Sequence, residues 1–313
     1  MTTRLWLAAA FALVLAQASS VQPLRVAVNM TTVESAPLFL AAQGAAGREM
    51  TLTGGGIPLL VNRTADVATN SETQILIRSV ESPDLRVVMT VAECEYRIVA
   101  RRSAGIRSLV DLRGRKIGTP AGTSAEYYLS KMLRTVKLDE PDVTVVPMAV
   151  ADMAAAMKRG DVAAVAGWEP GAQDSIDALG ADAIVFQERK IYRELFNLNT
   201  TAGVLGDPAK RRALVEIVRA IVEASRDVRA RPADGWPLLS SRINVPRATI
   251  ATVWQHFRFP AALPADLLDV LVEEEQWVAA RQKRSPRSRA QLQTLIDDAV
   301  LREALGGGKN NNR

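Results

Sequence analysis

The chain has 313 residues, a net charge of +5 and a hydrophobic fraction of 48%. This length is enough for one large domain or two ordinary ones, and the composition is that of a globular protein with a sizeable core. The basic residues are spread along the chain without a long block of like charges, which argues against a nucleic-acid-binding arm. We therefore expect no nucleic-acid partner.

The first residues have the layout of a secretory signal peptide. Arg4 precedes an apolar run at 5–15, and the small residues Ala16 and Ala18 follow it. This run has about half of the ~20 apolar residues that a membrane-spanning helix needs. Cys94 is the single cysteine, so no internal disulfide can form and no cysteine near residue 18 could carry a lipid. We expect residues 1–18 to be removed and the mature protein to be periplasmic, without a lipid anchor.

Short apolar strands alternate with helical segments over the first two thirds of the chain. Strands are bounded by polar or glycine residues, and helices end at glycine, as at Gly44, Gly160 and Gly180. The predicted strands are 23–30, 49–56, 65–70, 85–92, 96–102, 116–120, 142–148, 161–170 and 181–187. The predicted helices are 35–44, 57–64, 108–114, 124–135, 151–160 and 171–180. This alternation predicts an α/β fold with a mainly parallel sheet, and the pattern restarts after Ser103.

The last third of the chain has a different pattern. Apolar residues recur three and four positions apart in segments that are separated by prolines, which predicts helices. These segments are 209–230, 249–257, 265–284 and 289–305. Residues 306–313 are glycine, lysine, asparagine and arginine only, and we expect them to be disordered.

A search for catalytic residues finds little. His256 is the single histidine, and it lies on a predicted helix where packing is the more common role. Ser124 is not in a G-x-S-x-G motif, because Glu126 occupies the position of the second glycine. The sequence contains neither a P-loop nor a G-x-G-x-x-G fingerprint, and too few His and Cys for a typical zinc site. We expect no catalysis, no metal and no cofactor.

The loops that follow four of the predicted strands are rich in small hydroxyl, amide or aromatic groups. In open α/β sheets such loops line the ligand crevice. An alternative is helix capping, since Ser, Thr and Asn are preferred caps, and each single loop is compatible with either role. The candidate ligand-binding residues are Asn29, Thr31, Thr32, Glu34, Ser35, Thr69, Asn70, Ser71, Glu72, Thr119, Gly122, Thr123, Ser124, Trp168 and Glu169.

The loop before the helix at 124–135 illustrates both roles. Thr123 and Glu126 have the spacing of a capping box, in which Glu126 would bond to the Thr123 amide. The remaining amides of the helix terminus and the absence of a side chain at Gly122 would still favour a polar or anionic group of a ligand. The two roles predict different effects of substituting Ser124, which is not needed as the cap.

Several of these segments resemble one protein family. The segments 35–44, 65–74 and 152–170 are similar to periplasmic solute-binding proteins of ABC importers, and the strongest similarity is that of SLVDLRGRKIGTPAGTSAEYYL at 108–129. The branch is the one for nitrate, sulfonates, taurine and thiamine-pyrimidine precursors, and the resemblance covers residues 24–260. It implies a type II periplasmic-binding fold, in which two α/β lobes are joined by two crossings and hold the ligand between them.

The resemblance also implies a domain organisation and partners. Lobe one would contain residues 24–100 and 205–305, and lobe two residues 104–200, with crossings at 99–103 and 199–205. The protein would be a monomer that delivers a small polar or anionic solute (a sulfonate, nitrate, carboxylate or pyrimidine) to an inner-membrane ABC permease and its ATPase. Two alternatives remain open: an enzyme similar to those of thiamine-pyrimidine biosynthesis, and a soluble partner of a non-ABC transporter or a sensor kinase.

Overall fold

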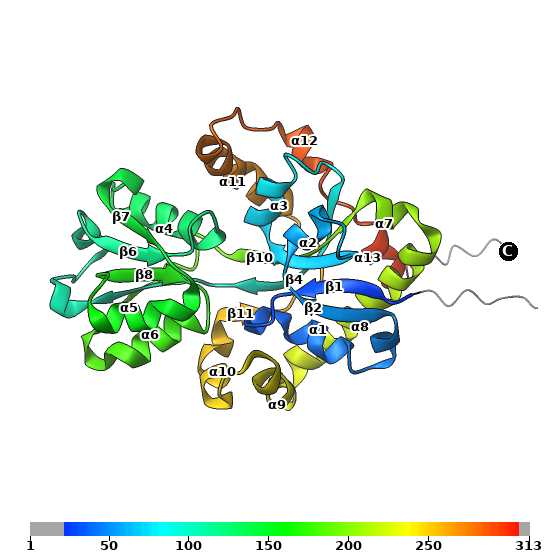
Figure 1. Cartoon of the computed structure of the whole chain (residues 1–313), viewed down its shortest axis with the longest axis horizontal. Coiled ribbons are helices and arrows are strands. Elements are labelled where there is room, and N and C mark those ends of the chain that lie inside the picture. The colour runs from blue at the N-terminus through cyan, green and yellow to red at the C-terminus, as the bar shows by residue number, and fades with distance from the viewer. Residues whose placement is uncertain (1–21, 307–313) are drawn as a thin grey trace, which may run out of the picture.

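The computed structural model describes residues 22–306. The expected signal peptide and residues 307–313 of the expected tail lie outside this range. Within it, two β-sheets lie side by side, each with helices packed against it, and lobe two is at the left of Figure 1. The expected α/β architecture with two lobes is confirmed, but the expected mainly parallel sheet is wrong, because both sheets contain parallel and antiparallel pairs. No helix among residues 22–306 is both long and apolar enough to cross a membrane.

Lobe one is built on a six-stranded sheet with the order β11-β4-β10-β3-β1-β2. Its strands are β1 (Leu24–Val28), β2 (Met50–Gly54), β3 (Val67–Ser71), β4 (Leu85–Cys94), β10 (Glu194–Thr201) and β11 (Phe257–Arg258). Strand β1 pairs in parallel with β2 and β3, and β10 is antiparallel to both β3 and β4. The loops after β1 and β3 therefore meet at one edge of the sheet, because the carboxyl ends of parallel strands lie together.

Lobe two is built on a five-stranded sheet with the order β7-β6-β8-β5-β9. Its strands are β5 (Arg97–Arg101), β6 (Lys116–Thr119), β7 (Thr144–Pro147), β8 (Ala164–Gly167) and β9 (Ala183–Phe186). Strand β6 is parallel to β7 and β8, whereas β5 is antiparallel to β8 and β9. The loops after β6 and β8 thus lie at the same sheet edge.

The helices follow the order of the chain. Those of the first two thirds are α1 (Ala36–Ala41), α2 (Ile57–Val61), α3 (Glu72–Arg78), α4 (Ser124–Thr135), α5 (Met153–Arg159), α6 (Gly171–Leu179) and α7 (Ala202–Gly206). Those of the last third are α8 (Pro208–Ala230), α9 (Pro232–Ile243), α10 (Arg247–Val253), α11 (Leu267–Arg281), α12 (Arg289–Gln293) and α13 (Ala299–Ala304). The segment 108–114, expected as a helix, contains only a short 3-10 turn (Leu109–Leu112), and the segment 289–305 is divided between α12 and α13.

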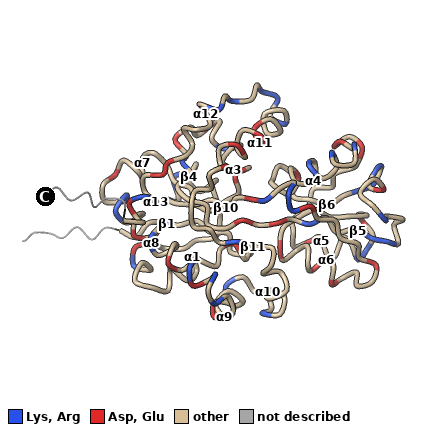
Figure 2. Tube along the Cα trace, turned by 180° about the vertical axis from the view of Figure 1, so that it is seen from behind, with Lys and Arg blue, Asp and Glu red and all other residues tan. Residues whose placement is uncertain are grey.

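The chain crosses between the lobes earlier than the sequence suggested. Strand β5 pairs within the sheet of lobe two, so the first crossing is the connection 95–96. Strand β10 pairs within the sheet of lobe one, so the second crossing is 187–193, before the expected 199–205. Both crossings carry charged residues (Figure 2), and Arg189 forms an ion pair with Glu95 at 3.0 Å. The two crossings therefore contact each other through charged side chains.

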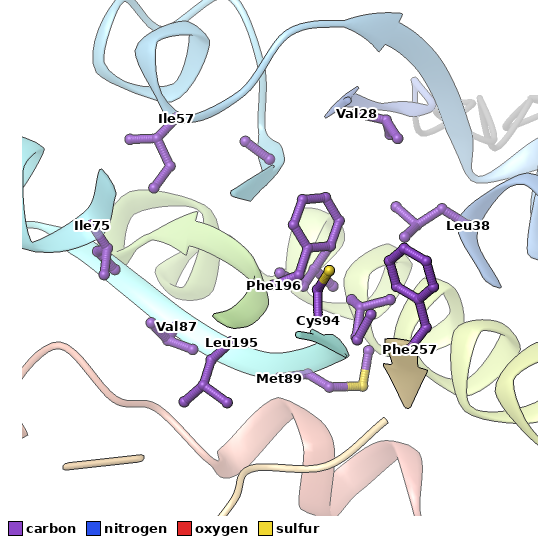
Figure 3. Packing of buried hydrophobic residues seen from close by; sticks show 14 of the residues in the cluster. Val28, Leu38, Ile57, Ile75, Val87, Met89, Cys94, Leu195, Phe196 and Phe257 are labelled. Carbon is purple, nitrogen blue, oxygen red and sulfur yellow. The ribbon is translucent and has the colours of Figure 1, made fainter. Parts of the chain in front are cut away.

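The apolar core is largest in lobe one. Met89 and Cys94 of β4 and Leu195 and Phe196 of β10 belong to one hydrophobic cluster. Side chains of other elements, such as Ile57 of α2, belong to it as well (Figure 3). All five of these side chains are buried. These side chains join β4 and β10 to the elements packed against them.

Candidate functional site

A cavity of about 330 Å³ lies between the two lobes. Lobe one contributes the loop after β1, the end of β3, helix α3 and strand β10 to its wall, and lobe two contributes the loops after β6 and β8 and the first residue of α4. The lining residues are Asn29, Thr32, Glu34, Asn70, Ser71, Gln74, Arg78, Ala121, Gly122, Thr123, Ser124, Trp168, Glu194 and Phe196. This position is where loops at the carboxyl ends of parallel strands of two sheets face each other.

The structure brings many of the residues singled out from the sequence to this cavity. From lobe one it places Asn29, Thr32, Glu34, Asn70 and Ser71 on the lining; from lobe two, Gly122, Thr123, Ser124 and Trp168. It does not place Thr31, Ser35, Thr69, Glu72, Thr119 and Glu169 there.

Three of the residues away from the lining fix the loop after β1. Ser35 Oγ donates a hydrogen bond to the carbonyl oxygen of Asn29 at 2.6 Å, and Thr69 Oγ1 accepts one from the Asn29 amide at 3.4 Å. Thr31 Oγ1 donates to Asn29 Oδ1 at 2.8 Å. These contacts position Asn29 at the cavity wall.

The other residues away from the lining are buried. Glu72 Oε2 accepts a hydrogen bond from the Leu195 amide at 2.8 Å and Oε1 accepts one from the Tyr192 hydroxyl, so both oxygens are used within the protein. Glu169 Oε1 accepts a bond from Arg97 Nε at 2.6 Å. Thr119 is buried at the end of β6. Spacing in the sequence cannot distinguish such internal partners from cavity-lining groups.

The loop before α4 differs in detail from the expected capping box. Thr123 Oγ1 does cap the helix, accepting from the Ala125 amide at 3.3 Å. Glu126 Oε2, however, accepts from the Gly122 amide at 2.6 Å and not from Thr123. Gly122 has a φ of +68°, a left-handed conformation that glycine adopts most easily. One of the amides that an anion could have used is therefore taken by a carboxylate.

Ser124 and Trp168 connect the cavity to an aromatic cluster. Ser124 Oγ lies 2.9 Å from the Tyr96 hydroxyl, and the rings of Tyr96 and Trp168 have centroids 6.0 Å apart. Trp168 is half-buried, whereas Tyr96 is buried. The indole of Trp168 thus presents an apolar face to the cavity.

The lobes contact each other on both sides of α4. Gln74 Nε2 of α3 donates to the Gly122 carbonyl at 3.0 Å beside the cavity. Helix α11, above the lobes in Figure 1, also reaches lobe two: Trp277 Nε1 donates to Glu140 Oε1 at 2.6 Å and Lys131 lies 2.6 Å from Glu273. These bonds would have to break for the lobes to separate.

Sequence reasoning missed five lining residues, namely Gln74, Arg78, Ala121, Glu194 and Phe196. Glu194 and Phe196 belong to β10, which was not predicted as a strand. The segment ELFNLNTT is entirely buried although five of its eight residues are polar, because side chains such as Thr90 bond to its polar groups. The available signal was the short group of apolar residues Leu195, Phe196 and Leu198, which do not alternate strictly with polar ones.

Glu34 and Glu194 form an acidic cluster at the cavity wall. One carboxylate oxygen of Glu34, one of Glu194 and the sulfur of Cys94 lie within 4.8 Å of one another, and the three side chains are buried. Burial raises the pKa of Glu34 to about 7. Burial, followed by the negative charges of Glu34 and Glu72, raises the pKa of Glu194 well above its usual value.

These three residues are also the cluster that could hold a metal ion. Two carboxylates and a thiolate are acceptable ligands for zinc. The Cys94 thiol does not line the cavity, and burial raises its pKa well above the usual value. The side chain of Cys94 is therefore poorly suited to act as a thiolate without a metal.

His256 is not on the cavity lining. It is 6% exposed, its Nδ1 lies 3.4 Å from Gln187 Nε2, and burial lowers its pKa to about 4. The imidazole is therefore neutral near pH 7 and packed beside the second crossing.

The family model that matches the chain is described as NMT1/THI5 like, and it covers residues 51–233. The chain belongs to the NMT1/THI5-like family. The matched residues of this NMT1/THI5-like chain include the loops after β3, β6 and β8 and strand β10, which together form most of the cavity wall. Among curated proteins, none is significantly similar in sequence.

Solved structures of similar fold include binding proteins and an enzyme. The periplasmic aliphatic sulphonate-binding protein SsuA from Escherichia coli is 17% identical with a TM-score of 0.73, over 88% of this chain and 97% of that one. The periplasmic nitrate-binding protein NrtA from Synechocystis PCC 6803 is 13% identical with a TM-score of 0.72, over 93% and 90%. The desulfurization enzyme DszB is 17% identical with a TM-score of 0.62, over 92% and 100%. These similarities establish for the NMT1/THI5-like chain the fold of two-lobed periplasmic binding proteins.

Proposed function

We propose that this protein is a non-enzymatic, extracytoplasmic solute-binding protein that delivers a small polar solute to an ABC importer. The observation that carries the proposal is the cavity of about 330 Å³ whose wall combines polar side chains of both lobes. A solute that contacts Asn70 on one side and Ser124 on the other gains its full set of contacts only when the lobes are together. Binding would therefore favour the closed arrangement, which a permease can recognise.

The contacts between the lobes support this proposal. Two short crossings join the lobes, and the other contacts between them are made by side chains. They include the hydrogen bonds of Gln74 and Trp277, the ion pairs of Arg281 and Lys131, and the packing of Tyr127 on Trp277. Rotation about the crossings could break these contacts without disturbing either sheet. The residue types at the cavity also favour binding over catalysis, because Cys94 is buried with a raised pKa and His256 lies away from the lining.

A screen of solutes tests the proposal. Thermal melts and calorimetric titrations would be run with taurine, alkanesulfonates, nitrate, aromatic acids, pyrimidines and riboflavin. A true ligand at a hundred times its Kd should stabilise the protein by about 2.7 kcal/mol. Turnover of one of these solutes, or the absence of binding by all of them, would contradict the proposal.

Tryptophan fluorescence locates the bound solute. Because Trp168 lines the cavity, a ligand should change its emission, and the change should disappear in Trp168→Phe. Trp236 and Trp254 pack against each other away from the cavity, so Trp254→Phe is the matched control and should keep the signal. A signal that survives in Trp168→Phe and disappears in the control would place binding elsewhere.

A further inference from the structure

The cavity wall contains buried oxygen atoms that lack hydrogen-bond partners. They are Glu34 Oε2, Glu194 Oε2 and Thr32 Oγ1, and each belongs to a residue that lines the cavity. Their side chains are at most 5% exposed. A buried acceptor without a donor is unfavourable by about 1–3 kcal/mol, and more for a charged group. The carboxylate oxygens of Glu34 and Glu194 at this end of the cavity are therefore acceptors that need donors, whereas the Thr32 hydroxyl can donate as well as accept.

We propose, on the basis of the solute-binding function above, that Glu34 and Glu194 bind a cationic N–H group of the solute: an ammonium, amidinium or guanidinium group. Such a group supplies both of the things that the carboxylates lack, namely hydrogen-bond donors and positive charge. A sulfonate, nitrate or carboxylate group supplies neither and would be repelled at this end.

The position of the two carboxylates suits one group that contacts both. Glu194 pairs with Cys94 across the β10–β4 ladder, and Glu34 follows β1 in the 3-10 turn Val33–Ser35. Because one carboxylate oxygen of Glu34 and one of Glu194 lie within 4.8 Å of each other, a single ammonium or a planar amidinium could reach both. No arginine or lysine forms an ion pair with Glu34 or Glu194 among the described residues. The cation is therefore absent from this part of the chain and has to come from the solute.

Other charged groups around the pair do not replace that cation. Glu72 on α3 adds negative charge next to Glu194, and Cys94 and Tyr96 on the β4 side are held neutral because burial raises their pKa values. Arg78 at the end of α3 lines the cavity but is exposed, and none of the ion pairs of residues 22–306 includes it. It is free to interact with an anionic group at the opposite end of the solute.

Without a bound cation, Glu34 and Glu194 have to reduce the repulsion between their charges by keeping a proton. Burial raises the pKa of Glu34 to about 7 and raises that of Glu194 well above its usual value, so the two carboxyl groups together retain a proton near neutral pH. Binding of a cationic group would stabilise the ionised carboxylates and release this proton to the buffer. Proton release on binding is consequently a signature of a cation at this site.

Matched solutes distinguish the cationic group from the rest of the molecule. Taurine and isethionate differ only in an ammonium in place of a hydroxyl, and benzamidine and benzoate share a ring but differ in the sign of charge. Titration calorimetry at pH 7 should find that taurine or benzamidine binds at least about tenfold tighter than its partner. Which of the two cationic compounds binds, taurine or benzamidine, also shows whether the site prefers an ammonium or an amidinium group. Heats measured in phosphate and in Tris should show that a proton is released.

Isosteric variants test the residues. Glu34→Gln and Glu194→Gln should each weaken binding of the cationic member about tenfold or more, without lowering the melting temperature of the empty protein. Glu274→Gln is the matched control, because Glu274 is equally buried, also has an unpartnered Oε2 and a raised pKa, and does not line the cavity. It should leave the affinity unchanged.

The possible outcomes separate this inference from the proposed function. If isethionate or benzoate binds as well as its cationic partner, with quenching of Trp168, the solute-binding function stands and the inference is wrong. If Zn²⁺ alone stabilises the protein and Cys94→Ser abolishes the effect, the cluster is a metal site and the inference is also wrong. If neither member of either pair nor any other solute of the screen binds, the proposed function fails and the inference fails with it.

Discussion

Two buried carboxylate sites in this molecule have opposite electrostatic environments. Glu275 on α11 is buried, and its oxygens bond to Arg284 at 2.5 Å and to Arg287 at 2.9 Å. Glu34 and Glu194 are almost as buried, yet no cation of the described chain pairs with them. At Glu275 the chain itself supplies the counter-charge, and the carboxylate stabilises the fold. Glu34 and Glu194 lack such a partner among the described residues and also line the cavity, where a solute can reach them.

The pKa values express the same difference. Hydrogen bonds from Arg284 and Arg287 overcome the effect of burial and lower the pKa of Glu275 to about 2. Burial without such bonds raises the pKa of Glu34 to about 7. The two sites should consequently make contributions of opposite sign to the dependence of stability on pH.

The largest expected effect on stability is at Glu275, whose charge is compensated by Arg284 and Arg287. Glu275→Gln should lower the free energy of unfolding by about 3 kcal/mol at pH 7, because it leaves two arginines without their buried partner. Urea denaturation measures this. Asp269→Asn on the same helix is the control: its pair with Arg289 is exposed, so the loss should be under about 1 kcal/mol. Equal losses in the two variants would mean that burial of Glu275 does not matter.

The contribution of Glu275 should depend on pH with a definite sign. Its pKa is lowered in the folded state, so its stabilisation is present above the unfolded value of 4.5 and is lost as the pH falls toward 2. Melts between pH 7 and pH 2 should therefore show a steeper acid loss in the wild type than in Glu275→Gln.

The contribution of Glu34, which has no cationic partner among the described residues, should depend on pH in the opposite direction. Because the folded pKa of Glu34 is raised, the wild type should lose stability as the pH rises from 4.5 through about 7. Glu34→Gln removes this loss, and at pH 8 it should be more stable than the empty wild type by on the order of 2 kcal/mol. A variant that is less stable than the wild type at pH 8 would show that Glu34 has a structural role.

A neutral group at the cavity wall should give a smaller effect. Ser124→Ala removes the hydrogen bond to the buried Tyr96 hydroxyl, and the free energy of unfolding should fall by about 1 kcal/mol. Thermal melts and titration with the best ligand of the screen separate stability from binding. If affinity falls about tenfold or more as well, Ser124 contacts the solute; if it is unchanged, the loop before α4 serves only to start the helix.

The smallest effect is expected at His256. Its imidazole is neutral near pH 7 and lies off the cavity, so His256→Ala should change the Kd less than about threefold, or about 0.6 kcal/mol. The pH dependence of binding should also be the same in the variant and the wild type between pH 6 and 8. A change of tenfold with the fold intact would place His256 in the site and favour an enzymatic role.

Local patterns in the sequence were sufficient for most elements and for the loops at the cavity. Strands such as β1 and β3 are short apolar runs that end in polar residues, and glycine stops such as Gly160 mark helix ends. The cavity-lining residues that the sequence predicted follow β1, β6 or β8 closely or are the last residues of β3. They could be found because the ends of parallel strands meet at one edge of a sheet whatever the details of packing.

Long-range pairing decided the rest. Strand β10 is placed between β3 and β4, far away in the sequence, and its polar residues are buried because partners on those strands bond to them. Glu169 was a candidate for the cavity, but Arg97, which is 72 residues away, pairs with it. The tertiary structure also joins Glu34 and Glu194 without providing a cation. A short window of sequence fixes propensity and capping, whereas the charge balance of a buried group depends on which distant side chains the fold brings to it, and that balance determines the character of this site.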